Sequence, residues 1–141
     1  MAERTVIEPK NAHLNVSRNK NLPHNPGIRV GDLVFLSGMV AVDPANGKIR
    51  TGSVAEETRM VLSNMQHMLQ SAGTDMENAV KLTVNLSDLS GYDEMNRVYR
   101  EFFGGASPPA CSVNVVELSF GLKIEIECLA AMPPAMTGSA Q

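Results

Sequence analysis

Residues 123–130, KIEIECLA, carry the pattern that decides the fold. Ile124, Ile126 and Cys128 alternate with Glu125 and Glu127, so one face of the segment is apolar and the other is acidic. A period of two is typical of a β-strand that packs one face against a core. The segment therefore predicts a strand near the C-terminus, and the surroundings of its two carboxylates become the central question.

Three further segments of the sequence predict strands. Residues 79–86, AVKLTVNL, alternate in the same way, with Val80, Leu82, Val84 and Leu86 expected on one face. Residues 33–42 and 48–50 are interpreted as neighbouring β segments joined by a turn at Asn46-Gly47, which accommodates positive φ. In SPPACSVNV (107–115) the prolines favour an extended backbone, and a strand is expected over 111–117.

Two helices are expected between these strands. Ser53 and Glu56 form a capping box, an apolar stripe at helical spacing follows, and Gly73 is suited to a left-handed end. Ser90 is expected to cap a second helix that ends at Gly104-Gly105. The side chains of the second helix that we expect to face inward are Tyr92, Met95, Tyr99 and Phe102.

The order of elements is β-β-α-β-α-β-β, which predicts an α+β domain with one sheet and two helices on one face. Strands 33–37 and 111–116 have apolar residues on both faces, and two helices can cover only one. We therefore expect further copies of the chain to cover the other face. The predicted organisation is an N-terminal arm (1–20), the domain (21–132) and a flexible C-terminal tail (133–141).

The amino-acid composition argues against several classes of function. The chain has 141 residues, 43% hydrophobic and 19% charged, as expected of one globular domain. Its net charge of −3, with scattered Lys and Arg, argues against a nucleic-acid partner. Neither the two cysteines nor the three histidines have metal-ligand spacing. We expect no metal, no membrane segment and no secretory signal, hence a cytoplasmic protein with free thiols.

Several motifs in this order resemble the Rid/YjgF family over roughly residues 21–132. The resemblance implies a chorismate-mutase-like fold with a single mixed sheet, and a homotrimer with small-molecule pockets at its interfaces. It also implies hydrolysis of a reactive enamine or imine to a carbonyl compound and ammonia, with no metal or other cofactor. The motifs are GDLVFLSG (31–38), the capped helix ending in Ala-Gly, VKLTVNLSDL (80–89), GYDEMNRVYREFF (91–103), PPA (108–110) and KIEIECLA.

The resemblance assigns roles to residues of this chain. Glu125 matches the glutamate that positions or activates water in the family. Ser37 and Gly38 match a Ser-Gly pair of the pocket, and Asn96 matches an asparagine that lines it. His24, in LPHNPG, stands where the family has a tyrosine and is expected to shape the pocket.

Cys111 is the departure from the family pattern, because it is matched to an arginine that grips the substrate carboxylate. Removing one partner of a buried charge pair costs roughly 2–5 kcal/mol, which is about 30-fold to several thousand-fold in affinity. A thiol cannot replace the guanidinium fork. We interpret Cys111 either as a small packing residue or as a catalytic pocket group, with the backbone of Cys111 and Ser112 holding the substrate.

Alternatives remain for both residues and function. Glu125 and Glu127 could form a solvated strand face, but closure by a partner subunit favours catalysis at Glu125 and an ion pair at Glu127. His67 is expected to be exposed. The leading function is a pathway-specific enamine or imine deaminase, and the alternative is a trimer that binds a metabolite without turnover. Thiol chemistry at Cys111 is a further alternative, while the acidic charge argues against ribonuclease activity.

Overall fold

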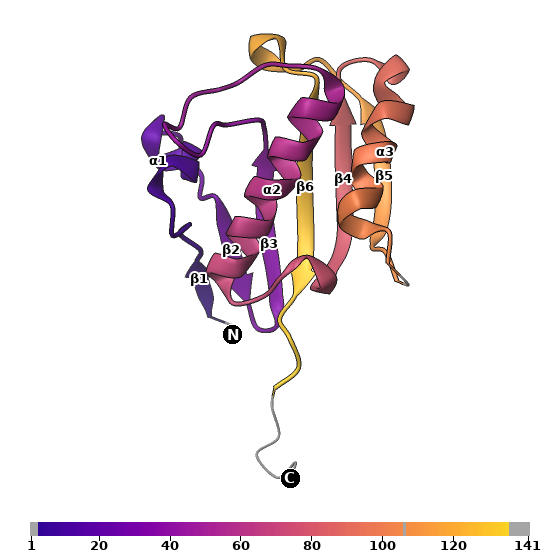
Figure 1. Ribbon diagram of the computed structural model, residues 1–141. Coiled ribbons are helices and arrows are strands. Elements are labelled where there is room, and N and C mark those ends of the chain that lie inside the picture. The colour runs from indigo at the N-terminus through magenta and orange to yellow at the C-terminus, as the bar shows by residue number, and fades with distance from the viewer. Residues whose placement is uncertain (1–2, 106, 136–141) are drawn as a thin grey trace.

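The computed structural model of the protein describes residues 3–105 and 107–135, which form a sheet with helices packed on it (Figure 1). Within this part of the chain no helix combines the length and apolar character that crossing a bilayer requires. The strands are β1 (Arg4–Val6), β2 (Gly27–Val30), β3 (Leu33–Met39), β4 (Ala79–Leu86), β5 (Ala110–Val115) and β6 (Ile124–Ala131); the α-helices are α1 (Val16–Asn19), α2 (Val54–Ala72) and α3 (Tyr92–Phe103).

The six strands form a single mixed sheet in the order β1-β2-β3-β6-β4-β5. Strands β4 and β5 are parallel, and the other neighbouring pairs are antiparallel. The C-terminal strand β6 lies inside the sheet, between β3 and β4, and so contacts segments from both halves of the chain. These findings confirm the predicted fold class.

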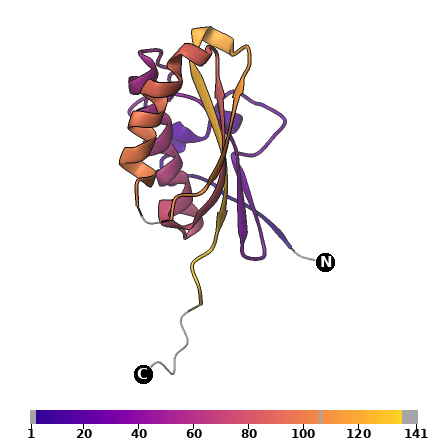
Figure 2. The same cartoon turned by 90° about the vertical axis from the view of Figure 1, so that its right-hand side faces the viewer.

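Helices α2 and α3 lie side by side on one face of the sheet (Figure 2). The apolar side chains of β4 and β6, among them Leu82, Val84 and Ile126, are fully buried beneath them. The opposite face, called the open face below, is not covered by either helix. It presents the polar side chains of β4 and β6, Glu125 among them.

Local signals placed α2 correctly. The Ser53 hydroxyl accepts a hydrogen bond from the Glu56 N–H, and the Glu56 carboxylate accepts one from the Ser53 N–H, so the predicted capping box is present. Gly73 ends the helix with a φ of 92°, a left-handed conformation that glycine adopts at little cost.

Three expectations at the edges of elements were wrong. The segment 48–50 makes only one isolated bridge, Val42 to Ile49, and is not a strand. Ser90 does not cap α3, because it lies in a short 3-10 turn whose cap is Asp88. Tyr92, expected to face inward, is 42% exposed at the first position of the helix.

The N-terminal segment adds to the sheet. Strand β1, within the predicted arm, pairs with β2, and β2 pairs with β3. A 3-10 turn (Ala12–Leu14) and α1 follow β1 and lie on the side of α2. Of the predicted tail, residues 136–141 lie outside the described residues.

Candidate active site

Glu125 belongs to a row of residues that crosses four strands on the open face. It is in register with Asn85 of β4, and Asn85 is in register with Asn114 of β5. Gly38 of β3 lies on the other side of Glu125. Residues in register on neighbouring strands point to the same face. We call Gly38, Glu125, Asn85 and Asn114 the polar row.

Two hydrogen bonds connect the polar row. The Asn85 side-chain amide donates to Oε1 of Glu125 at 3.2 Å, and the Asn114 amide donates to Oδ1 of Asn85 at 3.3 Å. Neither asparagine was predicted as a site residue. Their polar positions on alternating strands were visible, but their contact with Glu125 depends on a register that joins distant segments of the chain.

Gly38 allows the Glu125 side chain to lie flat against β3. A Cβ atom at position 38 would be 2.8 Å from Cδ of Glu125, closer than such atoms approach in real structures. The strand has an irregular register between Leu36 and Met39, which places Gly38 at a β-bulge. Gly38 and the Glu125 carboxyl group are therefore direct neighbours within one chain.

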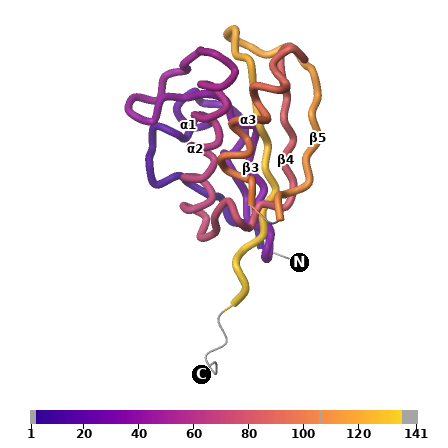
Figure 3. Tube along the Cα trace, turned by 45° about the vertical axis from the view of Figure 1, so that its right-hand side comes forward, coloured from indigo at the N-terminus to yellow at the C-terminus, as the bar shows by residue number. Residues whose placement is uncertain are grey.

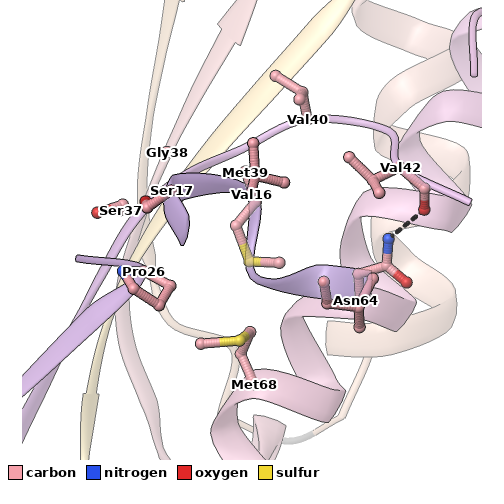
Figure 4. Close-up of a pocket in the computed structure, with 11 residues that line it drawn as sticks. Val16, Ser17, Pro26, Ser37, Gly38, Met39, Val40, Val42, Asn64 and Met68 are labelled. Carbon is pink, nitrogen blue, oxygen red and sulfur yellow. Dashed lines mark hydrogen bonds between the residues drawn. The ribbon is translucent and has the colours of Figure 1, made fainter. Parts of the chain in front are cut away.

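A small cavity of about 60 Å³ reaches the Ser37-Gly38 segment from the side of the helices (Figure 4). Its walls are mostly apolar and come from the segment around α1, from the end of β3 and from α2. Buried Asn64 of α2 also lines it and donates to the Val42 carbonyl oxygen at 2.7 Å. The cavity and the carboxylate of Glu125 therefore lie on either side of the same bulge in β3.

The Ser37 hydroxyl is occupied by a structural contact. It donates to the Asn25 carbonyl oxygen at 2.6 Å, and the Ser37 N–H donates to the Pro26 carbonyl oxygen at 3.0 Å. His24 precedes this loop, is exposed and has its Nδ1 atom 3.2 Å from Oγ of Ser17. The residues that Ser37 holds therefore follow His24 directly. The His24 side chain lines a hollow that includes none of the residues of the polar row.

Cys111 and Glu125 lie on opposite faces of the sheet within one chain, so a pocket that includes both side chains would have to be completed by another chain. Cys111 is in register with Leu82, whose side chain is fully buried on the helix side. Ala110 and Ser112 are the residues of this segment that face the same way as Glu125. The open face at the start of β5 therefore presents a methyl group and a hydroxyl group.

Asn96 is also remote from Glu125 in the single chain, because it belongs to α3 on the covered face. Figure 3 shows α3 next to β4 and β5, with the sheet between the helix and the open face. Any contact of Asn96 with a substrate held at Glu125 requires another chain.

The two thiols both flank Leu82 and are free. Cys128, from β6, is buried, and burial raises its pKa to about 12. Tyr99 of α3 lies close to the Cys111 thiol on the edge strand β5. Burial and this thiol raise the pKa of the Tyr99 hydroxyl. At neutral pH the Cys128 thiol and the Tyr99 hydroxyl, both on the helix side of the sheet, are therefore neutral.

A second row on the open face is apolar. Val6 is in register with Ile28, Ile28 with Phe35, and Phe35 with Leu129. Val6, on the edge strand β1, and Phe35, on β3 inside the sheet, are 46% and 45% exposed, which are large fractions for apolar side chains. We call these four residues the apolar row. It continues the open face from the carboxylates toward β1.

The ion pair predicted for Glu127 is not found among the described residues. Glu127, which is in register with Thr83, is exposed and takes part in no ion pair among residues 3–105 and 107–135. The same part of the chain has no cluster of three or more His, Cys, Asp or Glu arranged as metal ligands.

Comparison with known proteins places the chain in a family. The sequence profile of the Endoribonuclease L-PSP family matches residues 18–132. Human 2-iminobutanoate/2-iminopropanoate deaminase is 35% identical over 117 residues, which are 83% of this chain and 85% of the human protein. The crystal structure of YyfA from Yersinia pestis, a protein of the conserved Rid family, superposes with a TM-score of 0.83 at 29% identity, covering 92% of this chain and 100% of YyfA. E. coli TdcF with bound serine gives a TM-score of 0.73 at 32% identity, with 79% of this chain and 89% of TdcF covered.

The chain therefore belongs to the Rid/YjgF family, also called the Endoribonuclease L-PSP family, as its motifs predicted.

Proposed function

We propose that this protein hydrolyses a small enamine or imine to a carbonyl compound and ammonia, with Glu125 as the catalytic carboxylate. The observation that carries the proposal is the setting of Glu125: one carboxylate oxygen accepts an amide hydrogen bond, and the group lies against a glycine on a half-buried face. The human relative's name adds support, because it identifies that protein as an imine deaminase.

The chemistry needs a group that accepts a proton from water and returns it. Water adds to the carbon of the protonated imine while Glu125 takes one of its protons, which gives a carbinolamine. The carboxylic acid then protonates the nitrogen, the C–N bond breaks, and ammonia leaves while the Glu125 carboxylate takes the hydroxyl proton as the carbonyl forms. An enamine is first protonated at carbon to give the imine. The reaction balances as imine plus water to carbonyl plus ammonia, and a carboxylate with one free oxygen can carry each proton.

A homotrimer is the assembly that would close the site. The apolar row leaves Phe35 and Val6 about half exposed, and burial of apolar area contributes roughly 25 cal/mol per Å². The same face holds Glu125, so a copy packed on the apolar row would also exclude water from the polar row. Exclusion of water strengthens the electrostatic interactions of the carboxylate with a substrate. Asn96 and the His24 loop could then join the pocket from a second chain.

The substrate is expected to differ from a simple 2-imino acid, which fits a pathway-specific role. A carboxylate substrate calls for a cation, and the residues of the open face around Glu125 are Glu127, Thr83, Asn85, Ser112 and Asn114. Lys81 is the lysine of β4 on this face, and it lies four residues before Asn85 along the strand. Serine bound in TdcF shows a small amino acid in a relative, and a related molecule with a less acidic anchor would suit this face.

The experiment is ammonia release from freshly generated enamines and imines by wild type and by Glu125→Gln. Glu127→Gln is the matched control, because it removes a charge from the same face and the same strand. We expect Glu125→Gln to lose about 10²-fold or more, the usual contribution of a positioned acid–base group. Equal rates for wild type and Glu125→Gln would contradict the role of Glu125.

Binding without turnover is the second candidate, and the methyl group of Ala110 on the face of Glu125 favours it, since no guanidinium is available there. Thermal unfolding in the presence of small amino acids and keto acids distinguishes the two. Stabilisation by a ligand, with no ammonia released from any imine tested, would support a metabolite-binding protein.

A further inference from the structure

We infer that Asn85 and Asn114 are positioning residues that act on Glu125 as a two-amide relay. The relay holds Oε1 of the carboxylate and leaves Oε2 as the oxygen that exchanges protons with water. This inference rests on the proposed function of Glu125 and names two residues to which neither the sequence motifs nor the comparisons assign a role.

The relay spans three neighbouring strands. Glu125 is on β6, Asn85 on β4 and Asn114 on β5, and each is in register with the next. The hydrogen bonds are 3.2 Å and 3.3 Å long. Because the two pairs are cross-strand neighbours in a sheet, the side chains are held at this spacing by the backbone and lose little freedom when they bond.

The carboxylate determines the orientation of both amides. An ionised carboxylate can only accept hydrogen bonds, so the Asn85 group that faces it must be the NH₂. The Asn85 oxygen then faces β5, and Asn114 must present its own NH₂ to it. Both bonds in the structure run in this direction, from Asn114 to Asn85 to Glu125. The row therefore presents an N–H donor to Oε1 of Glu125.

The two oxygens of Glu125 are placed differently as a result. Oε1 faces Asn85, and the whole carboxyl group lies over Gly38, whose missing Cβ would be 3.0 Å and 3.1 Å from Oε1 and Oε2. No described side chain donates a hydrogen bond to Oε2. The free lone pairs of that oxygen are thus held in one place by contacts on two sides, from Asn85 and from Gly38.

The relay has an order, which gives it a distinctive pattern of mutational effects. Asn85 contacts the carboxylate directly, whereas Asn114, which is exposed on the edge strand, acts only by orienting Asn85. Loss of the Asn85 amide should therefore have a larger effect than loss of the Asn114 amide. Asn85→Asp replaces the donor with a second carboxylate of the same shape, and like charges at this distance hinder each other's ionisation.

The test compares pH profiles of kcat/KM for ammonia release by the whole protein with wild type, Asn85→Asp, Asn85→Ala and Asn114→Ala. For Asn85→Asp we expect the acid-side midpoint to move up by about one pH unit, as a neighbouring like charge does. We expect Asn85→Ala to lower kcat about tenfold with KM changed little, and Asn114→Ala to have a smaller effect in the same direction. Thr5→Val, at an exposed position of the edge strand β1 and outside the polar row, should retain the wild-type profile.

An acid-side midpoint that stays unchanged in Asn85→Asp, in protein with a wild-type melting transition, would overturn the relay. A fall in rate that follows only the melting temperature, with equal losses in Thr5→Val, would overturn it as well. If Asn85→Asp does not fold, Asn114→Asp on the exposed edge strand supplies the second readout, with a midpoint shift expected to be smaller and in the same direction. The proposed function fails separately, by full activity of Glu125→Gln, so the two failures are distinguishable.

Discussion

Gly38 supports the Glu125 carboxyl group from the neighbouring strand, at a separation that admits no side chain. A Cβ at position 38 would lie 2.8 Å from Cδ of Glu125. We expect Gly38→Ala to push the carboxylate from its place and to reduce ammonia release by about 10²-fold, the cost of a displacement of roughly 1 Å. The side chain can rotate away, so stability should change little. Steady-state kinetics together with thermal unfolding measure the two effects.

Gly105→Ala is the control for this variant, because a Cβ at position 105 would meet no atom within 4 Å. It should retain wild-type kinetics. Unimpaired turnover in Gly38→Ala would mean that the position of the Glu125 carboxylate against β3 is not required for activity.

The alternation of β5 predicts opposite outcomes for two adjacent substitutions. Ala110→Arg places a guanidinium on the face of Glu125, while Cys111→Arg places it on the helix side. For 2-iminobutanoate as substrate, we expect Ala110→Arg to raise kcat/KM at least about tenfold, since a charge pair with a carboxylate contributes roughly 2–5 kcal/mol when buried. Kinetics with this substrate measure the gain.

Cys111→Arg is the matched control and should bring no gain, because the new side chain is separated from Glu125 by the sheet. A gain with Cys111→Arg and none with Ala110→Arg would show that the substrate is held from the other side of β5, and would contradict the placement of the site on the open face.

Local sequence features predicted what is local in the structure. The capping box at Ser53 and the alternation of residues 123–130 each specify their own element, and α2 and β6 form as expected. The contact between Glu125 and Asn85 could not be predicted in this way, since it depends on the insertion of β6 between β3 and β4. The sequence does not show how β5 pairs with β4, or β4 with β6. It therefore did not reveal that Ala110, and not Cys111, lies on the same face of the sheet as Glu125.

The sequence predicted less well the parts of the structure that form only through contacts between distant segments. Strands β1 and β2 have three and four residues and form by pairing at the edge of the sheet, with no clear alternation of their own. His67, expected to be exposed, is half-buried because the N-terminal segment packs on α2.

The buried Cys128 thiol should make the free energy of unfolding fall at alkaline pH. Burial raises its pKa from about 9 to about 12, so above pH 9 the unfolded chain loses a proton that the folded chain keeps. The free energy of unfolding should then fall by up to about 1.4 kcal/mol per pH unit between pH 9 and pH 12. The contribution is fully present below pH 9. Urea unfolding at about pH 7.5 and pH 10 measures it.

Cys128→Val is the comparison for this effect, since valine fills the site without a titratable group. It should be less sensitive than wild type to the same rise in pH. Equal losses of stability in the two proteins would show that the Cys128 thiol does not contribute.

His67 fastens the N-terminal segment to α2. The Asn11 N–H donates to Nε2 of His67 at 2.9 Å, and the Lys10 N–H donates to the Ser71 hydroxyl at 3.0 Å. His67→Ala removes the first of these acceptors. We expect faster hydrogen exchange at the Asn11 amide and a loss of about 1 kcal/mol of stability. Ser63→Ala, at an exposed position of the same helix, should change neither, and unaltered exchange at Asn11 in His67→Ala would contradict the fastening.

The proposal that copies of the chain build the active site on the open face is tested most directly by measuring mass and activity on the same sample. Wild type and Phe35→Asp are compared by light scattering and by ammonia release. For wild type we expect three times the 15.2 kDa mass of one chain, with turnover. For Phe35→Asp, whose side chain is already 45% exposed in the single chain, we expect a folded protein of one chain mass without turnover. Full turnover by a protein with the mass of one chain would contradict the proposal.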